Sequence, residues 1–95
     1  VKRLGRAQEG WKRAKKTINI DHHISNEKFA DFNWIEAEAT STGQVVSWLF
    51  KEMKITPTKD IASLLYVTLL TDTGCYSHSN TNSDALNWGA ELIAL

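Results

Sequence analysis

The chain has 95 residues, and 42% of them are hydrophobic, which is enough for one small domain but not for two. Its apolar runs stay far below the roughly 18 residues that a membrane span requires, which excludes a membrane-spanning protein. The single cysteine, Cys75, excludes an internal disulfide framework and favours a reducing compartment. We therefore expect a cytoplasmic protein without membrane contact.

The eleven basic and eleven acidic residues balance, but they are separated along the chain. Residues 1–16 carry a net charge of +6, and residues 17–95 carry −6. A basic segment of this kind either attracts phosphate groups or forms the solvated face of an amphipathic helix. The composition leaves both interpretations open.

One helix and two strands are expected in the N-terminal part of the chain. Apolar residues at spacings of three to four predict a helix over residues 5–15 with its charges outward. Residues 17–20 favour a strand, and residues 30–37 alternate loosely enough to predict a second short strand. The apolar positions of the helix are Leu4, Ala7, Trp11 and Ala14.

Three helices are expected in the remainder of the chain. Ser41, with Gln44 three residues later, forms a capping-box pattern that predicts the start of the first. Thr58 is the expected N-cap of the second helix, which is expected to end at Gly74. This helix is apolar nearly all round, so we expect it to be buried on several sides. Ser83 is the expected N-cap of the third. The residues expected to face inward are Val45, Leu49, Phe50 and Met53 in the first helix and Leu86, Ala90 and Ile93 in the last.

The alternation of strands and helices with short links predicts an α/β fold, with a parallel sheet flanked by helices. Ligands in such folds gather at the carboxyl ends of the strands, where Asp21, His22 and His23 stand directly after the first strand. Side chains on an extended chain alternate in direction, so the three are not expected to bind one ion from one face. We expect one inward ligand, with its neighbours orienting it or touching a substrate.

Asp72 is the second candidate, because it is a carboxylate near the C-terminus of an otherwise apolar helix. The helix dipole disfavours an anion at this end, and a bound metal ion would remove that penalty. Mixed imidazole and carboxylate ligands suit Mn, Mg, Co, Zn or Fe. His78 is interpreted as a surface residue and Cys75 as a small packing residue. Residues 79–83 are expected to hydrogen-bond their own backbone and cap the last helix, so Ser79-Asn80-Thr81 is interpreted as structural.

Two longer stretches around these candidates resemble the DHH phosphoesterase superfamily. "INIDHHISNEKFADFNWIEAEATSTGQVV" resembles the third motif of its bacterial bifunctional oligoribonuclease and phosphoadenosine-phosphate (pAp) phosphatase branch, and "LLYVTLLTDTGCYSHSNTNSDAL" resembles the fourth. The resemblance implies an α/β/α sandwich. The family's first two motifs and its C-terminal substrate-binding domain have no counterpart here. With a start at Val1 and an end in an apolar phrase, residues 1–95 are expected to be an internal segment of one DHH catalytic domain, inactive alone.

The resemblance also implies roles for individual residues. His22 and Asp72 match metal ligands, His23 matches a catalytic histidine that contacts the scissile phosphate of the substrate, and Asp21 supports the histidines. The implied cofactor is two divalent ions, Mn²⁺ first, with Mg²⁺ or Co²⁺ as alternatives. The implied reaction is hydrolysis of short oligoribonucleotides or 3′-phosphoadenosine 5′-phosphate, and a homodimer of the full-length protein is compatible with it.

Three alternatives stay open. A manganese-dependent inorganic pyrophosphatase and a dinucleotide phosphodiesterase belong to the same superfamily. A non-catalytic module that binds nucleic acid through the basic residues 1–16 belongs to another class, and predicts binding that is sensitive to salt but indifferent to metal.

Overall fold

Strands β1 (Ile18–Asp21) and β2 (Phe32–Ile35) pair in parallel, with Ile18 opposite Phe32 and Asp21 opposite Ile35. They belong to a computed structural model that describes residues 2–95. Within residues 2–95, the sheet consists of these two strands. The rest of the regular structure is helical, so the α/β prediction holds at the level of a small mixed helix and strand arrangement.

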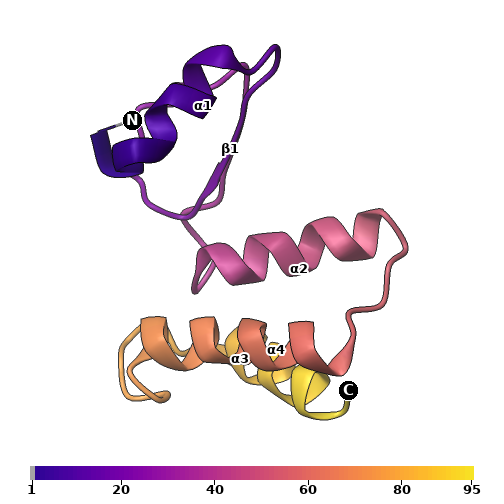
Figure 1. Ribbon diagram of the computed structural model, residues 1–95. Coiled ribbons are helices and arrows are strands. Elements are labelled where there is room, and N and C mark those ends of the chain that lie inside the picture. Colours follow the sequence, from indigo (N-terminus) through magenta and orange to yellow (C-terminus); the bar gives the residue numbers. More distant parts are fainter. Residues whose placement is uncertain (1) are drawn as a thin grey trace.

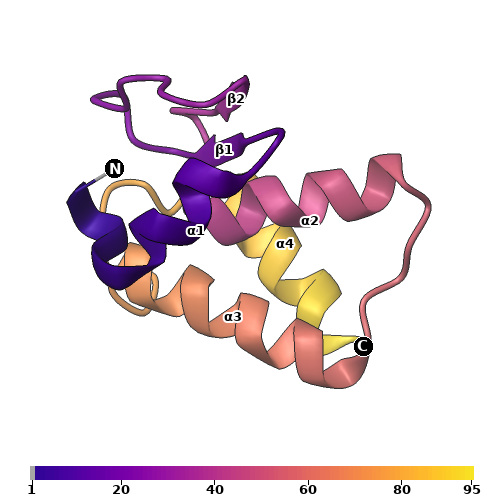
Figure 2. The ribbon, with the colours of Figure 1, turned by 45° about the horizontal axis from the view of Figure 1, so that its top comes forward.

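Helix α2 (Thr42–Glu52) lies between the sheet and helix α3 (Lys59–Thr73), as Figure 1 shows. Helix α4 (Ser83–Ile93) packs against α3, and Figure 2 shows it crossing behind α2 and α3. None of the helices described for residues 2–95 combines the length and apolar character that crossing a membrane requires. The arrangement places the end of β1 beside the N-terminus of α2.

Helix α2 begins where the capping pattern predicts. Ser41 is the N-cap, and its Oγ accepts a hydrogen bond from the backbone N–H of Gln44 at 3.2 Å. The Gln44 side chain differs from a capping box, because its Oε1 accepts from the backbone N–H of Thr40 at 2.8 Å instead of from Ser41. Val45 is fully buried as expected, whereas Met53 is exposed because it lies at the end of the helix.

Helix α3 also has the predicted ends. The Thr58 side chain accepts from the N–H of Ile61, and Gly74 closes the helix in the left-handed conformation (φ 58°, ψ 48°) that glycine adopts without strain. The expectation of burial on several sides is wrong for the described residues. One face is buried, while Leu64 and Val67 on the other are exposed.

The main core forms between α3 and α4, and here the predicted face of the last helix is wrong. Leu86 and Ile93 are 53% and 70% exposed, and Ala90 is also exposed. The Trp88 indole is buried instead, with Nε1 donating to Ser47 Oγ at 2.9 Å. Asn82, not Ser83, is the N-cap, and its side chain accepts from Ala85 N. The core consists of Ala62, Leu65, Leu69, Ala85, Trp88 and Leu92.

The predicted N-terminal helix is shorter and broken. A 3-10 helix, η1 (Lys2–Ala7), contains a non-helical Gly5 and is followed by α1 (Gln8–Arg13). Residues of α1 are exposed or half-buried, and Trp11 makes its contact with Phe29, at 5.4 Å between ring centroids. The apolar stripe is therefore anchored by one aromatic contact and buries little surface.

Candidate metal centre

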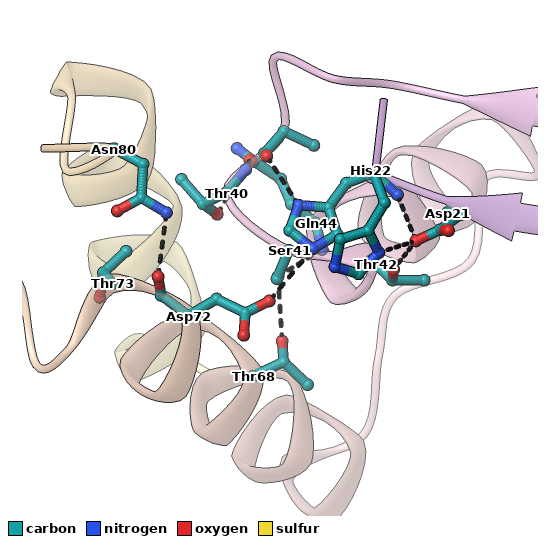
Figure 3. Close-up of polar contacts among 12 residues, drawn as sticks. Asp21, His22, Thr40, Ser41, Thr42, Gln44, Thr68, Asp72, Thr73 and Asn80 are labelled. Carbon is teal, nitrogen blue, oxygen red and sulfur yellow. Dashed lines mark hydrogen bonds and ion pairs between the residues drawn. The ribbon is translucent and has the colours of Figure 1, made fainter. Parts of the chain in front are cut away.

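His22 lies just after β1, and its ring is held by the chain on both sides. Nδ1 lies 3.2 Å from the carbonyl oxygen of Ala39, and Nε2 lies 3.4 Å from Oδ2 of Asp72 (Figure 3). A carbonyl only accepts, so Nδ1 carries the proton and donates it. Nε2 is the ring nitrogen that faces Asp72, and without a proton it could offer its lone pair to a metal ion, as metal-binding imidazoles do.

Asp72 comes from the last turn of α3 and reaches His22 from a distant part of the sequence. Its backbone carbonyl accepts a hydrogen bond from Asn80 Nδ2 at 3.0 Å, which ties the helix end to the following loop. The side chain of Asp72 is 38% exposed, and that of His22 is 17% exposed. The carboxylate therefore stays accessible while its backbone is fixed.

A close contact between α2 and α3 brings these two residues together. Gly43 packs directly on the Thr68 side chain, where a Cβ would overlap Oγ1. Ser41 Oγ lies 3.2 Å from Thr68 Oγ1, and Thr68 donates its own proton to the carbonyl of Leu65 at 2.7 Å. Since Ala39 precedes α2 and Asp72 ends α3, the spacing of these helices sets the distance between His22 and Asp72.

This pair fits a divalent metal ion. Two ligand atoms that share one ion at about 2.1 Å lie about 3–3.5 Å apart, which matches the observed separation. If Nε2 carries no proton, a cation between the imidazole and the carboxylate would be attracted by the lone pairs of both. Nitrogen and oxygen donors of this kind suit Mn, Mg, Co, Zn or Fe.

Asp21 ends β1 and is occupied by hydrogen bonds from its own chain. Oδ1 accepts from the backbone N–H of His22 at 2.7 Å, from the His23 ring at 2.7 Å and from Thr42 Oγ1 at 3.3 Å. Oδ2 accepts from Asn26 Nδ2 at 2.9 Å. Burial opposes ionisation of this carboxyl, but the hydrogen bonds from Asn26, His23 and the backbone outweigh it and hold the pKa of Asp21 well below its usual range.

The triplet is closer together than an extended chain predicts. Asp21, His22 and His23 each bring one ligand atom within 4.8 Å of the others, because β1 ends at Asp21 and the chain turns. The expectation that their side chains diverge was therefore wrong. The donors on both oxygens of Asp21 nevertheless favour a supporting role for this carboxylate.

The ring of His23 lies beside that of His22, with 4.3 Å between the ring centroids, and lines an open pocket of about 740 Å³. Its Nδ1 is engaged by Asp21, which leaves Nε2 for a ligand. The pocket is also lined by Asn26, by the charged residues Arg3, Asp21 and Glu27, and by the aromatic ring of Phe29. Its volume lies in the range of small-molecule sites.

Sequence reasoning missed or misjudged several residues at this site. Asn26 and Thr42 hold Asp21, although the only sequence signal was their polar character close to the triplet and at a helix start. Asn80 has a structural role, as expected, and it exerts this role by donating a hydrogen bond to the backbone carbonyl of Asp72. Cys75 is exposed and has a positive φ of 55°, so it is not a packing residue, whereas His78 is exposed as expected.

The segment is therefore a small mixed α/β unit in which a histidine and an aspartate lie close enough together to share one ion. Among known proteins, no family model matches it. The chain is 42% identical over 82 residues to an uncharacterized protein, MG371, of Mycoplasma genitalium. It is 34% identical over 76 residues to a protein of Thermus thermophilus named bifunctional oligoribonuclease and PAP phosphatase NrnA, and 31% identical over 81 residues to the Bacillus subtilis protein of that name.

These matches cover most of this chain but a small part of each relative. They include 86%, 80% and 82% of the chain, and 25%, 24% and 26% of the three relatives, respectively. The chain thus spans about a quarter of the length of the curated relatives it matches. It has homologues named NrnA over about four-fifths of its length.

Proposed function

We propose that this chain is part of the catalytic domain of a DHH-superfamily phosphoesterase of the NrnA type. The observation that carries the proposal is the convergence of His22 and Asp72, which are distant in sequence, at 3.4 Å with the His22 ring oriented by Ala39. The similarity to proteins named oligoribonuclease and PAP phosphatase supports the same class. The substrates proposed are short oligoribonucleotides and 3′-phosphoadenosine 5′-phosphate.

His22 and Asp72 would hold a divalent metal, and we propose two Mn²⁺ in the complete site, with Mg²⁺ or Co²⁺ as alternatives. Such ions supply Lewis acidity for the phosphate oxygens and an acidified water as nucleophile. The remaining ligands of a two-metal site would come from outside residues 1–95. The α/β/α sandwich and a homodimer belong to that complete protein in the same proposal.

His23 is the residue proposed to act on the substrate. Because Nδ1 donates to Asp21 at 2.7 Å, its Nε2 is the atom available in the pocket. In the imidazolium form, Nε2 carries a proton that can stabilise a phosphoryl oxygen or pass to the leaving oxygen. Asp21 contributes by holding the ring.

The pocket supports a nucleotide as the substrate. Arg3 offers a cation for a phosphate, and Phe29 offers a ring for a base. The overall net charge of +6 in residues 1–16 acts in the same direction by attracting phosphates. A cytoplasmic setting is part of the proposal, since the exposed thiol of Cys75 stays reduced there.

The test uses the full-length protein with Mn²⁺ and four substrates: 3′-phosphoadenosine 5′-phosphate, a short RNA, a dinucleotide and pyrophosphate. We expect hydrolysis of the first two, and a loss of at least about 100-fold in His22→Ala and Asp72→Ala. Asp84→Ala, an exposed acid on α4, is the matched control and keeps full activity. Preference for pyrophosphate or for the dinucleotide would favour the alternative enzymes, and unchanged activity in both variants would refute the metal assignment.

A further inference from the structure

The hydrogen bonds around Asp21 divide its carboxylate into two parts with different partners. Oδ1 receives the ring of His23, the backbone N–H of His22 and the hydroxyl of Thr42. Within the described residues, Oδ2 accepts a hydrogen bond from the side-chain amide of Asn26 at 2.9 Å. The orientation of the whole carboxylate thus depends on Asn26 at one end and on the turn at the other.

The orientation of the Asn26 amide follows from the chemistry of its partners. A carboxylate only accepts, so the NH₂ group must face Asp21. A backbone N–H only donates, so Oδ1 must face Lys28 N, at 2.7 Å. Both contacts agree on one arrangement, and the assignment of nitrogen and oxygen is unambiguous.

Asn26 is itself anchored to the sheet. Its Oδ1 accepts from Nδ2 of the buried Asn19 on β1 at 2.6 Å, and Asn19 Nδ2 also reaches Asn33 Oδ1 on β2 at 3.2 Å. Hydrogen bonds between asparagine side chains therefore link β2 through β1 to the turn that contains Asp21, His22 and His23. Because Asn19 is buried and lies in the paired part of the sheet, these hydrogen bonds form a rigid support.

We propose that Asn26 is a positioning residue: its amide fixes the Asp21 carboxylate so that Asp21 holds the His23 ring. The inference rests on the proposed function, in which His23 contacts the substrate. It goes further by assigning Asn26, which also lines the pocket, a role exerted through Asp21.

The decisive variant is Asn26→Asp, which has the same shape. It keeps an oxygen for Lys28 N and Asn19 Nδ2 but replaces the NH₂ group, which donates to Asp21 Oδ2 at 2.9 Å and to Asn19 Oδ1 at 3.2 Å, with a second oxygen. In the full-length protein with Mn²⁺ and 3′-phosphoadenosine 5′-phosphate, we expect kcat to fall about 10–100-fold while KM changes less than about 3-fold. Asn87→Asp adds the same charge on an exposed face of α4 and leaves kcat unchanged.

A double-mutant cycle separates positioning from general damage. If Asn26 acts through His23, Asn26→Asp costs less than about 2-fold further in a His23→Ala background. Bound Mn²⁺ per protein stays the same in both backgrounds. The same fold loss with and without His23, or a fall in bound Mn²⁺, would overturn the proposal.

A spectroscopic measurement keeps this inference independent of the activity. In the Mg²⁺-loaded, ¹⁵N-histidine-labelled protein, one Nδ1–H signal disappears in His23→Ala and thereby belongs to His23. At fixed pH we expect that signal to be lost through faster solvent exchange in Asn26→Asp and kept in Asn87→Asp. Absence of phosphoesterase activity in the wild-type protein refutes the proposed function alone, whereas an unchanged His23 signal in Asn26→Asp refutes the role of Asn26.

Discussion

Nε2 of His22 and Oδ2 of Asp72 lie 3.4 Å apart, although one residue follows a strand and the other ends a helix far along the chain. If this pair binds metal, the charge of Asp72 is needed as well as its shape. We predict that Asp72→Asn weakens Mn²⁺ binding at least about 10-fold, because the amide lacks the negative charge that the ion offsets.

Titration of the metal-free, full-length protein with Mn²⁺ measures this effect. Asp60→Asn, at the opposite end of α3 and exposed, is the matched control and should bind as the wild type does. Equal affinity in Asp72→Asn and wild type would show that this carboxylate is not a ligand.

The contact between Gly43 and Thr68 provides a second prediction, because it sets the spacing of α2 and α3. Gly43→Ala places a Cβ against Thr68 Oγ1, and the helices must separate. We expect a loss of about 1–3 kcal/mol in the free energy of unfolding, from overpacking, and a weaker Mn²⁺ affinity. Thermal unfolding and metal titration measure the two effects.

Gly10→Ala is the control for that substitution. Gly10 lies in α1, and a Cβ there has no atom of the described chain within 4 Å, so alanine should be neutral or slightly stabilising. Adding Thr68→Ala to Gly43→Ala removes the clashing hydroxyl and should recover part of the lost stability. If the double variant is no more stable than Gly43→Ala, the loss of stability does not come from the contact with the Thr68 hydroxyl.

The start of α4 distinguishes the sequence-based cap from the observed one. Asn82 Oδ1 accepts from the backbone N–H of Ala85 at 2.8 Å, whereas Ser83 is the first residue inside the helix. We predict that Asn82→Ala lowers the free energy of unfolding by about 1 kcal/mol and that Ser83→Ala has little effect. Chemical denaturation of the two variants, side by side, measures the difference, and the reverse order would restore Ser83 as the cap.

The hydroxyl of Tyr76 provides a prediction about alkaline stability. It donates to the Tyr66 hydroxyl at 3.0 Å, and this hydrogen bond, together with burial, raises the pKa of Tyr76 to about 12. The folded state therefore holds this proton more tightly than the unfolded state, whose tyrosine has its ordinary pKa of 10.0. The resulting stability is complete below pH 10 and is lost as the pH rises from about 10 to about 12.

Tyr76→Phe removes this titration. We expect the variant to be less stable than the wild type at neutral pH, because the hydrogen bond is absent, and to lose less stability between pH 10 and pH 12. Urea midpoints across that range measure the slope. An identical slope in both proteins would mean that Tyr76 titrates alike in the folded and unfolded states.

Local signals explain which elements could be predicted from the sequence. Ser41 and Thr58 act through hydrogen bonds to backbone groups three residues away, and Gly74 acts through its own backbone angles. Interactions of such short range depend little on the rest of the fold. The starts of α2 and α3 and the end of α3 were therefore predictable.

Side-chain faces were less predictable, because neighbouring elements decide them. Helix α4 has apolar residues on more than one side, and the sequence pattern favoured Leu86 and Ile93. In the structure, Trp88 turns inward because Ser47 on α2 accepts its indole N–H, and Gly89 allows close approach to Tyr76 and Leu69. Those partners come from α2, α3 and the turn after α3, so periodicity could not identify them.

The sequence by itself determined the candidate residues at the site: the triplet Asp21-His22-His23 at a strand end and Asp72 at a helix end. Only the tertiary structure decided which of them lie together. Packing of α2 on α3 brings Asp72 to Nε2 of His22, and hydrogen bonds from Asn26 and the turn occupy Asp21. The physical reason is range: chain order fixes the contacts of near neighbours, whereas the positions of distant ligand atoms depend on how whole elements pack.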